Sequence, residues 1–213
     1  MTKITIFKSL EDAIYKSKKY NSSFHIPTKN LSKDYIIKKS VSSNIFRAFR
    51  NLPKKPSSIY RDWANKHFDD IILNINNIKT QRAFDKYLYD LVNSLISNWK
   101  LKVPVNGRIM YGPAIKMVNL LFKTIQHSRD HRRENILPFL HVPFDEYSLK
   151  PLTNIINQLA NCDFKISIPG NVTMQFITNP ELYLIIKNAV FNLSRQANIY
   201  PIIYDYWSWN RTH

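Results

Sequence analysis

Two side chains near the middle of the sequence have the chemistry of a nucleophile and its partner. Lys116 follows Gly112-Pro113 in the first turn of a predicted helix, and Asp145 follows Pro143 at the start of a later one. A neutral lysine amine can attack the anomeric carbon of a nucleoside and form a Schiff base once the base departs. An aspartate at the same site would stabilise the positive charge that develops on the sugar.

Both residues also have a simpler interpretation. The pKa of a nucleophilic lysine has to fall from about 10.4, and the positive end of a helix dipole favours such a fall. However, Lys116, Asn119 and Lys123 share one side at helical spacing and fit a solvated face. Asp145 fits a helix cap equally well. The residues by themselves leave these alternatives open.

Other catalytic signatures are missing from the sequence. There is no HExxH motif, the six histidines are scattered, and no GxSxG motif supports a serine nucleophile. The single cysteine, Cys162, excludes an intramolecular disulfide and a CxxC metal site. Three glycines argue against a P-loop or a dinucleotide-binding fold. We therefore expect no metal and no cofactor.

The net charge points to a polyanionic partner. The 213 residues include 31 Lys and Arg against 15 Asp and Glu, which gives a formal charge of +16. Such an excess suits nucleic acid better than a membrane. The sequence has no signal peptide and no run of 18 apolar residues, so we expect a cytoplasmic protein without a membrane segment.

Hydrophobic periodicity predicts a mostly α fold, a helical bundle of two lobes around a cleft. Helices are expected near 9–14, 31–49, 57–78, 80–99, 114–125, 144–161 and 179–197. Alternation on both sides of Pro169-Gly170 predicts one small β-hairpin over 163–178, and Ile4 to Phe7 has a short strand-like pattern. We group the chain as one domain, 1–213: N-terminal helices 1–103, a catalytic segment 104–161, the hairpin 163–178, and a C-terminal helix with an aromatic tail 179–213.

The catalytic segment and the tail resemble a known superfamily. Gly112-Pro-Ala-Ile-Lys116 followed by Pro143-Phe-Asp145 resembles the helix-hairpin-helix DNA glycosylases, in which a lysine ends the hairpin and an aspartate follows. The long gap between the two residues, and the tail Ile199-Tyr-Pro201 with Asp205 and Trp209, are similar to the archaeal 8-oxoguanine DNA glycosylase branch. The resemblance covers about 107–150 and 180–210.

The resemblance implies a monomer that excises an oxidised or otherwise modified base from duplex DNA, in repair or in antiviral defence. Lys116 would be the nucleophile and Asp145 its electrostatic partner. The extruded base would be held by Asp205 and Trp209, with Trp63 as a further stacking aromatic. The DNA backbone would contact Arg108, Gly112, Lys123, Arg129, Arg132 and Arg133.

Two other functions stay open at this point. One is a basic helical DNA-binding module without catalysis, such as a regulator or a defence accessory protein. The other is an RNA-directed toxin or nuclease that uses scattered His and Arg side chains. Borohydride trapping on DNA with a modified base separates the glycosylase hypothesis from these two alternatives, because borohydride traps only a lysine Schiff base.

Overall fold

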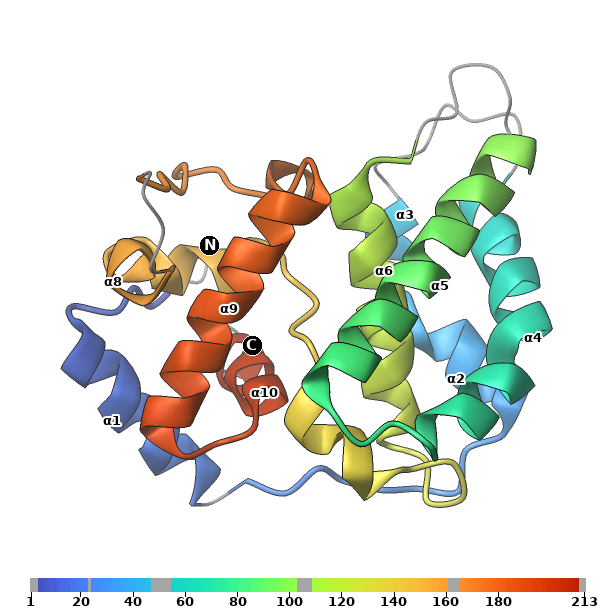
Figure 1. Ribbon diagram of the computed structural model, residues 1–213, viewed down its shortest axis with the longest axis horizontal. Helices are drawn as coiled ribbons and strands as arrows, with labels where there is room; N and C mark the ends of the chain where they lie inside the picture. The colour runs from blue at the N-terminus through green and yellow to red at the C-terminus, as the bar shows by residue number, and fades with distance from the viewer. Residues whose placement is uncertain (1–3, 23, 47–54, 103–108, 161–164, 211–213) are drawn as a thin grey trace. The chain divides into compact units, whose positions relative to one another are not determined.

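The protein is mostly helical and divides into two compact units. The computed structural model describes residues 4–22, 24–46, 55–102, 109–160 and 165–210. Unit 1 consists of Met1–His25 and Leu140–His213, and unit 2 consists of Ile26–Phe139 (Figure 1). Within the described ranges no helix is both long and apolar enough to cross a bilayer.

Unit 2 is built from packed helices joined by short connections. Its elements are α2 (Lys33–Ser40), α3 (Ser43–Phe46), α4 (Pro56–Ile75), α5 (Gln81–Lys102), α6 (Tyr111–Ile125) and the 3-10 helix η2 (Glu134–Phe139). The helix predicted over 80–99 is confirmed as α5, and it buries one apolar stripe, formed by Phe84, Leu88, Leu91, Leu95 and Trp99. In Figure 1, α5 lies between α4 and α6 and packs on both. The core of unit 2 is therefore formed by these three helices with α2.

The helix predicted over 31–49 is interrupted in its middle. Val41 has extended backbone angles and ends α2, and α3 begins two residues later. The hydroxyl of Ser40 donates to the carbonyl of Ile37 and lies 2.8 Å from the hydroxyl of Tyr60 on α4. This side-chain bonding competes with continuation of the helix, and the contact with Tyr60 is a tertiary one.

Unit 1 is centred on the long helix α9 (Pro180–Ala197). It packs against α1 (Leu10–Asn21), α8 (Ile156–Ala160) and α10 (Pro201–Asn210). The predicted starts of α1 and α9 are confirmed: the side chains of Ser9 and Asn179 accept from the backbone N–H groups of Asp12 and Leu182. Each cap satisfies a donor that a helix start leaves without an intrahelical partner.

The predicted β-hairpin over 163–178 is wrong for the residues that the structure describes. Residues 165–178 contain no strand, and Met174–Phe176 forms the 3-10 helix η4. The side-chain amide of Asn157, on α8, accepts from the N–H of Ile166 at 2.7 Å and donates to its carbonyl at 3.0 Å. One asparagine therefore satisfies the backbone groups that a partner strand would have paired.

The short strand-like pattern from Ile4 to Phe7 does not form a strand either. The N–H of Phe7 donates to the carbonyl of Pro151, and the carbonyl of Phe7 accepts from the side chain of Asn154.

Two further segments differ from prediction. The expected helix over 144–161 is divided into α7 (Glu146–Leu149), the 3-10 helix η3 (Lys150–Leu152) and α8, because Pro151 cannot continue an α-helix. The aromatic tail, for which no helix was predicted, forms α10 from Pro201. Its residues 201–208 are all buried, so tertiary packing outweighs the modest helix propensity of its aromatic side chains.

Candidate functional site

Lys116 lies in the second turn of α6. The helix begins at Tyr111, one turn earlier than predicted, so that Gly112 and Pro113 form part of it rather than a preceding turn. The helix dipole acts mainly on the first turn, so its effect on Lys116 is smaller than the sequence suggested. Met110 provides the N-cap backbone and makes no side-chain capping bond.

Lys116 is buried. Every residue from Gly112 to Asn119 is buried, and the Lys116 side chain is only 7% exposed. The alternative of a solvated face over Lys116 and Asn119 is therefore wrong, although Lys123, two turns further on, is half-buried. Burial of an ammonium group costs several kcal/mol unless other interactions compensate, and lysines are seldom fully buried unless they are paired.

Asp145 caps α7 in unit 1. Its Oδ1 accepts from the backbone N–H groups of Tyr147 at 2.9 Å and Ser148 at 3.2 Å, while the Ser148 hydroxyl accepts from the N–H of Asp145 at 2.8 Å. This reciprocal arrangement is a capping box, and it fixes the carboxylate with 7% exposure. A carboxylate has two oxygens with several acceptor positions, so capping through Oδ1 is compatible with a second role.

Helix α10 brings the predicted base-binding residues to the same part of unit 1 as Asp145. The Tyr204 hydroxyl donates to the carbonyl of Ser148 at 2.6 Å, and the Trp209 ring lies 5.0 Å from the ring of Tyr147. Burial raises the pKa of the Tyr204 phenol well above its usual range, and the carboxylates of Asp205 and Asp145 raise it further. Three predicted site residues, Asp145, Asp205 and Trp209, are thus gathered on α7 and α10.

Exposure differs between the two base-binding candidates. Asp205 is completely buried, whereas Trp209 is half-buried and retains accessible ring surface. Of these two side chains, Trp209 presents ring surface that a ligand could contact, whereas the Asp205 carboxylate is enclosed by protein.

Trp63 does not belong with them. Its ring is 2% exposed in the core of unit 2, where its Nε1–H donates to the Ser94 hydroxyl at 3.1 Å. The rings of Tyr60 and His67 pack at 6.1 and 5.3 Å from it. Both its surface and its donor are used in the core, so we drop the predicted stacking role of Trp63.

The predicted backbone-binding arginines are largely engaged within unit 2. Arg132 forms an ion pair with Glu134 at 3.1 Å, and Arg133 donates to the side chain of Asn76 and to the backbone carbonyls of Asp130 and Arg132. Arg129 is exposed, and Gly112 is buried in α6. Arg108 lies outside the described residues.

A polar cluster that was not predicted lies beside the segment leading to Asp145. Nδ1 of His141 lies 2.7 Å from the Tyr183 hydroxyl, and the ring of Phe144 packs edge-on against Tyr183 at 5.9 Å. Lys187, four residues after Tyr183 on α9, is 4% exposed, and its Nζ lies 5.2 Å from the centre of the Phe191 ring. The helical spacing of Tyr183 and Lys187 was visible in the sequence, but their burial was not.

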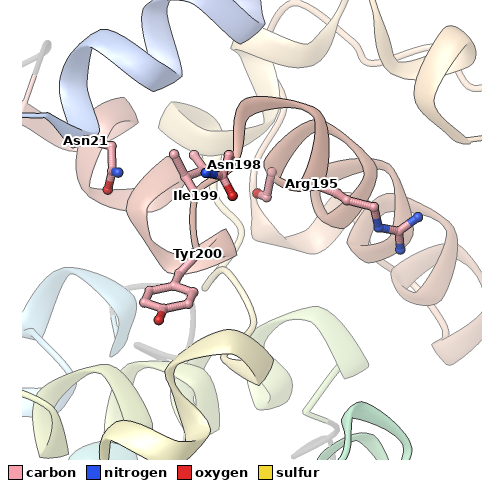
Figure 2. Close-up of a pocket in the computed structure, with 6 residues that line it drawn as sticks. Asn21, Arg195, Asn198, Ile199 and Tyr200 are labelled. Atoms are coloured by element: carbon pink, nitrogen blue, oxygen red, sulfur yellow. The ribbon is translucent and has the colours of Figure 1, made fainter.

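A pocket elsewhere in unit 1 contains none of the predicted catalytic residues. It has a volume of about 380 Å³, and its lining residues are Asn21, Ser194, Arg195, Asn198, Ile199 and Tyr200. Figure 2 shows the Arg195 guanidinium directed away from Asn21 and Asn198. The candidate chemistry therefore does not lie in this pocket. Among the described residues, no group of three or more His, Cys, Asp or Glu side chains could hold a metal ion.

Comparison with protein-family models, with curated proteins and with solved structures finds no match to this chain.

Proposed function

We propose that the protein is a DNA N-glycosylase that removes an oxidised or otherwise modified base, with Lys116 as the nucleophile and Asp145 as its electrostatic partner. The observation that best supports this proposal is the burial of Lys116 among apolar residues of α6. A lysine used only for solubility would be exposed at little cost, whereas a lysine nucleophile needs a site with little water.

In the proposed reaction, the neutral amine of Lys116 attacks C1′ of the target nucleotide. The N-glycosidic bond breaks, and the base leaves with the bonding electron pair and takes up a proton. Asp145 stabilises the positive charge that builds up on the sugar. Loss of the amine proton and ring opening then give a Schiff base between Lys116 and C1′, which can lead to strand cleavage or be hydrolysed. Trp209 stacks on the extruded base, and entry of the base has to uncover the buried Asp205 carboxylate before that carboxylate can accept hydrogen bonds from it.

The experiment is borohydride trapping on duplexes that carry a panel of modified bases, with binding measured on the same DNA. Borohydride reduces the imine to a stable amine, so a covalent adduct reports the nucleophile directly. We expect Lys116→Gln to abolish the adduct and to leave DNA binding intact, because glutamine retains helix propensity but has no nucleophilic amine.

Lys187→Gln is the matched control, since Lys187 is the other buried lysine within the described part of the chain. An adduct that survives in Lys116→Gln and disappears in Lys187→Gln would move the nucleophile to α9 and contradict the assignment. An exposed lysine of α5, Lys86, provides a second control that should form the adduct normally.

A second candidate function is a DNA-binding module without catalysis. It is favoured by the charge of unit 2, which carries 21 Lys and Arg against 8 Asp and Glu. Tight binding by the unmodified protein with no adduct and no base release on any duplex would make this the correct function. Cleavage of RNA instead of DNA would support the RNA-directed toxin or nuclease, and it would contradict both the glycosylase and the non-catalytic DNA-binding module.

A further inference from the structure

The positive charge of the chain is concentrated in unit 2. Residues 26–139 carry 21 of the 31 Lys and Arg but 8 of the 15 Asp and Glu, a net charge of +13. The remainder, in unit 1, amounts to +3. Any polyanion that the protein binds through its charge is therefore expected to bind mainly to unit 2.

Within unit 2 the charge is uneven along the sequence. No Asp or Glu occurs between Asp34 and Asp62, a stretch with 7 Lys and Arg. None occurs between Asp90 and Asp130, a stretch with 6 Lys and Arg. Two separate segments therefore supply positive charge without compensating carboxylates.

The fold brings part of each segment to one end of the helices of unit 2. Lys33 pairs with Asp69 at 2.8 Å, whereas Ser40 meets Tyr60, so α2 and α4 run antiparallel. The bond from Trp63 to Ser94, and the short connection between α4 and α5, make these two helices antiparallel as well. The last turn of α2, the first turn of α4 and the last turn of α5 therefore share one end.

We call this the basic end of unit 2 and define it by Lys38, Lys39, Lys55, Lys100 and Lys102. All five side chains are exposed. No ion pair involves any of them within the described ranges, and Asp62, on the second turn of α4, is the nearest carboxylate along these helices.

The opposite end of unit 2 has a different charge pattern. Asp34 lies in the first turn of α2, Asp69 and Asp70 lie near the end of α4, and Asp85 lies in the first turns of α5. Its cations are partly neutralised, as in the pairs of Lys33 with Asp69 and Arg132 with Glu134. The arginine segment that was predicted to bind DNA thus belongs to the mixed end.

We infer that the basic end of unit 2 is the surface that binds the phosphate backbone of a nucleic acid. Exposed lysines without carboxylate partners can each displace a condensed counterion from a phosphate, which is the main source of affinity for a polyanion. Leu101, 80% exposed between Lys100 and Lys102, is an apolar side chain that can contact a sugar or a base step. A single leucine among lysines is not the broad apolar face that membrane binding needs.

The test removes three charges from this end and three from the other. The basic-end variant is Lys38→Gln with Lys55→Gln and Lys100→Gln, one change for each of α2, α4 and α5. The matched control is Lys79→Gln with Arg82→Gln and Lys86→Gln, three exposed positions around the start of α5. Both variants have the same net charge, and thermal melts would show that both fold.

Binding to an unmodified DNA duplex is measured over a range of salt concentrations. We expect the basic-end variant to lose about 3 from the slope of log K against log salt, and about two to three orders of magnitude of affinity near 0.1 M salt. For the control variant, the change in slope and the change in log K should each be less than about a tenth of those of the basic-end variant. Equal losses in the two variants, or a larger loss in the control, would overturn the inference.

Vesicles with anionic lipids provide the competing surface. Binding to such vesicles that is tighter than binding to the duplex, and lost in the basic-end variant, would assign the surface to a membrane and overturn the inference. The inference does not depend on Lys116. A protein that binds through this end and never forms an adduct would refute the glycosylase proposal and leave this surface in place.

Discussion

Asp145 caps α7 and is also proposed to stabilise the charge on the sugar. Two substitutions distinguish these roles. Asp145→Asn keeps an oxygen for the N–H groups of Tyr147 and Ser148 and should leave the free energy of unfolding nearly unchanged. It removes the negative charge, so single-turnover base release should slow by about 100-fold or more. Asp145→Ala should show the same loss of rate and also a loss of about 1 kcal/mol in urea unfolding. Full base release in Asp145→Asn would reduce Asp145 to a helix cap.

At the scale of an element, the end of α9 depends on one left-handed residue. Asn198 has φ 52° and ψ 51°, and the N–H of Ile199 returns to the carbonyl of Ser194 at 3.0 Å. Asparagine adopts this conformation more easily than alanine, and glycine adopts it without a steric penalty. Asn198→Ala should therefore lower the free energy of unfolding by about 1 kcal/mol, whereas Asn198→Gly should leave it equal or higher. Chemical denaturation measures the free energy of unfolding of both variants. Equal destabilisation by alanine and glycine would mean that loss of the asparagine side-chain amide, rather than backbone strain, lowers the stability.

At the scale of the whole molecule, buried phenols determine the alkaline limit of stability. Burial raises the pKa of Tyr87 to about 12 and also raises the pKa of Tyr60 and Tyr204. Above pH about 10, the unfolded chain releases phenolic protons that the folded chain keeps, so the free energy of unfolding falls as pH rises. Each of the two fully buried tyrosines, Tyr60 and Tyr204, contributes a slope of up to about 1.4 kcal/mol per pH unit above pH about 10. Tyr87 is only half-buried, so its contribution is smaller.

Tyr204→Phe tests this directly. The variant loses the hydrogen bond to the Ser148 carbonyl, so its stability at neutral pH should be lower by about 1 kcal/mol. Its slope between pH 10 and 11 should be smaller by about one proton. Urea unfolding at pH 9, 10 and 11 gives both values, and an unchanged slope would show that Tyr204 ionises as readily in the folded protein as in the unfolded chain.

The sequence by itself determined the features that depend on residues three or four positions apart. The caps at Ser9 and Asn179, the apolar stripe of α5 and the mostly helical class follow from such spacing, and the structure confirms them. The helix predicted over 144–161 was wrong at Pro151, where the ring ends the α-helix. The alternation over 163–178 was equally local, and it was misleading.

Only the tertiary structure decided what each segment contacts. The backbone of Ile166 bonds to Asn157, the tail becomes a buried helix, and Lys116 is buried rather than on a solvated face. The same holds for the charges, because antiparallel packing of α2, α4 and α5 collects at one end the lysines that the sequence separates. The physical reason is that burial, backbone satisfaction and local electric potential depend on neighbours far apart in the chain, which no short pattern encodes.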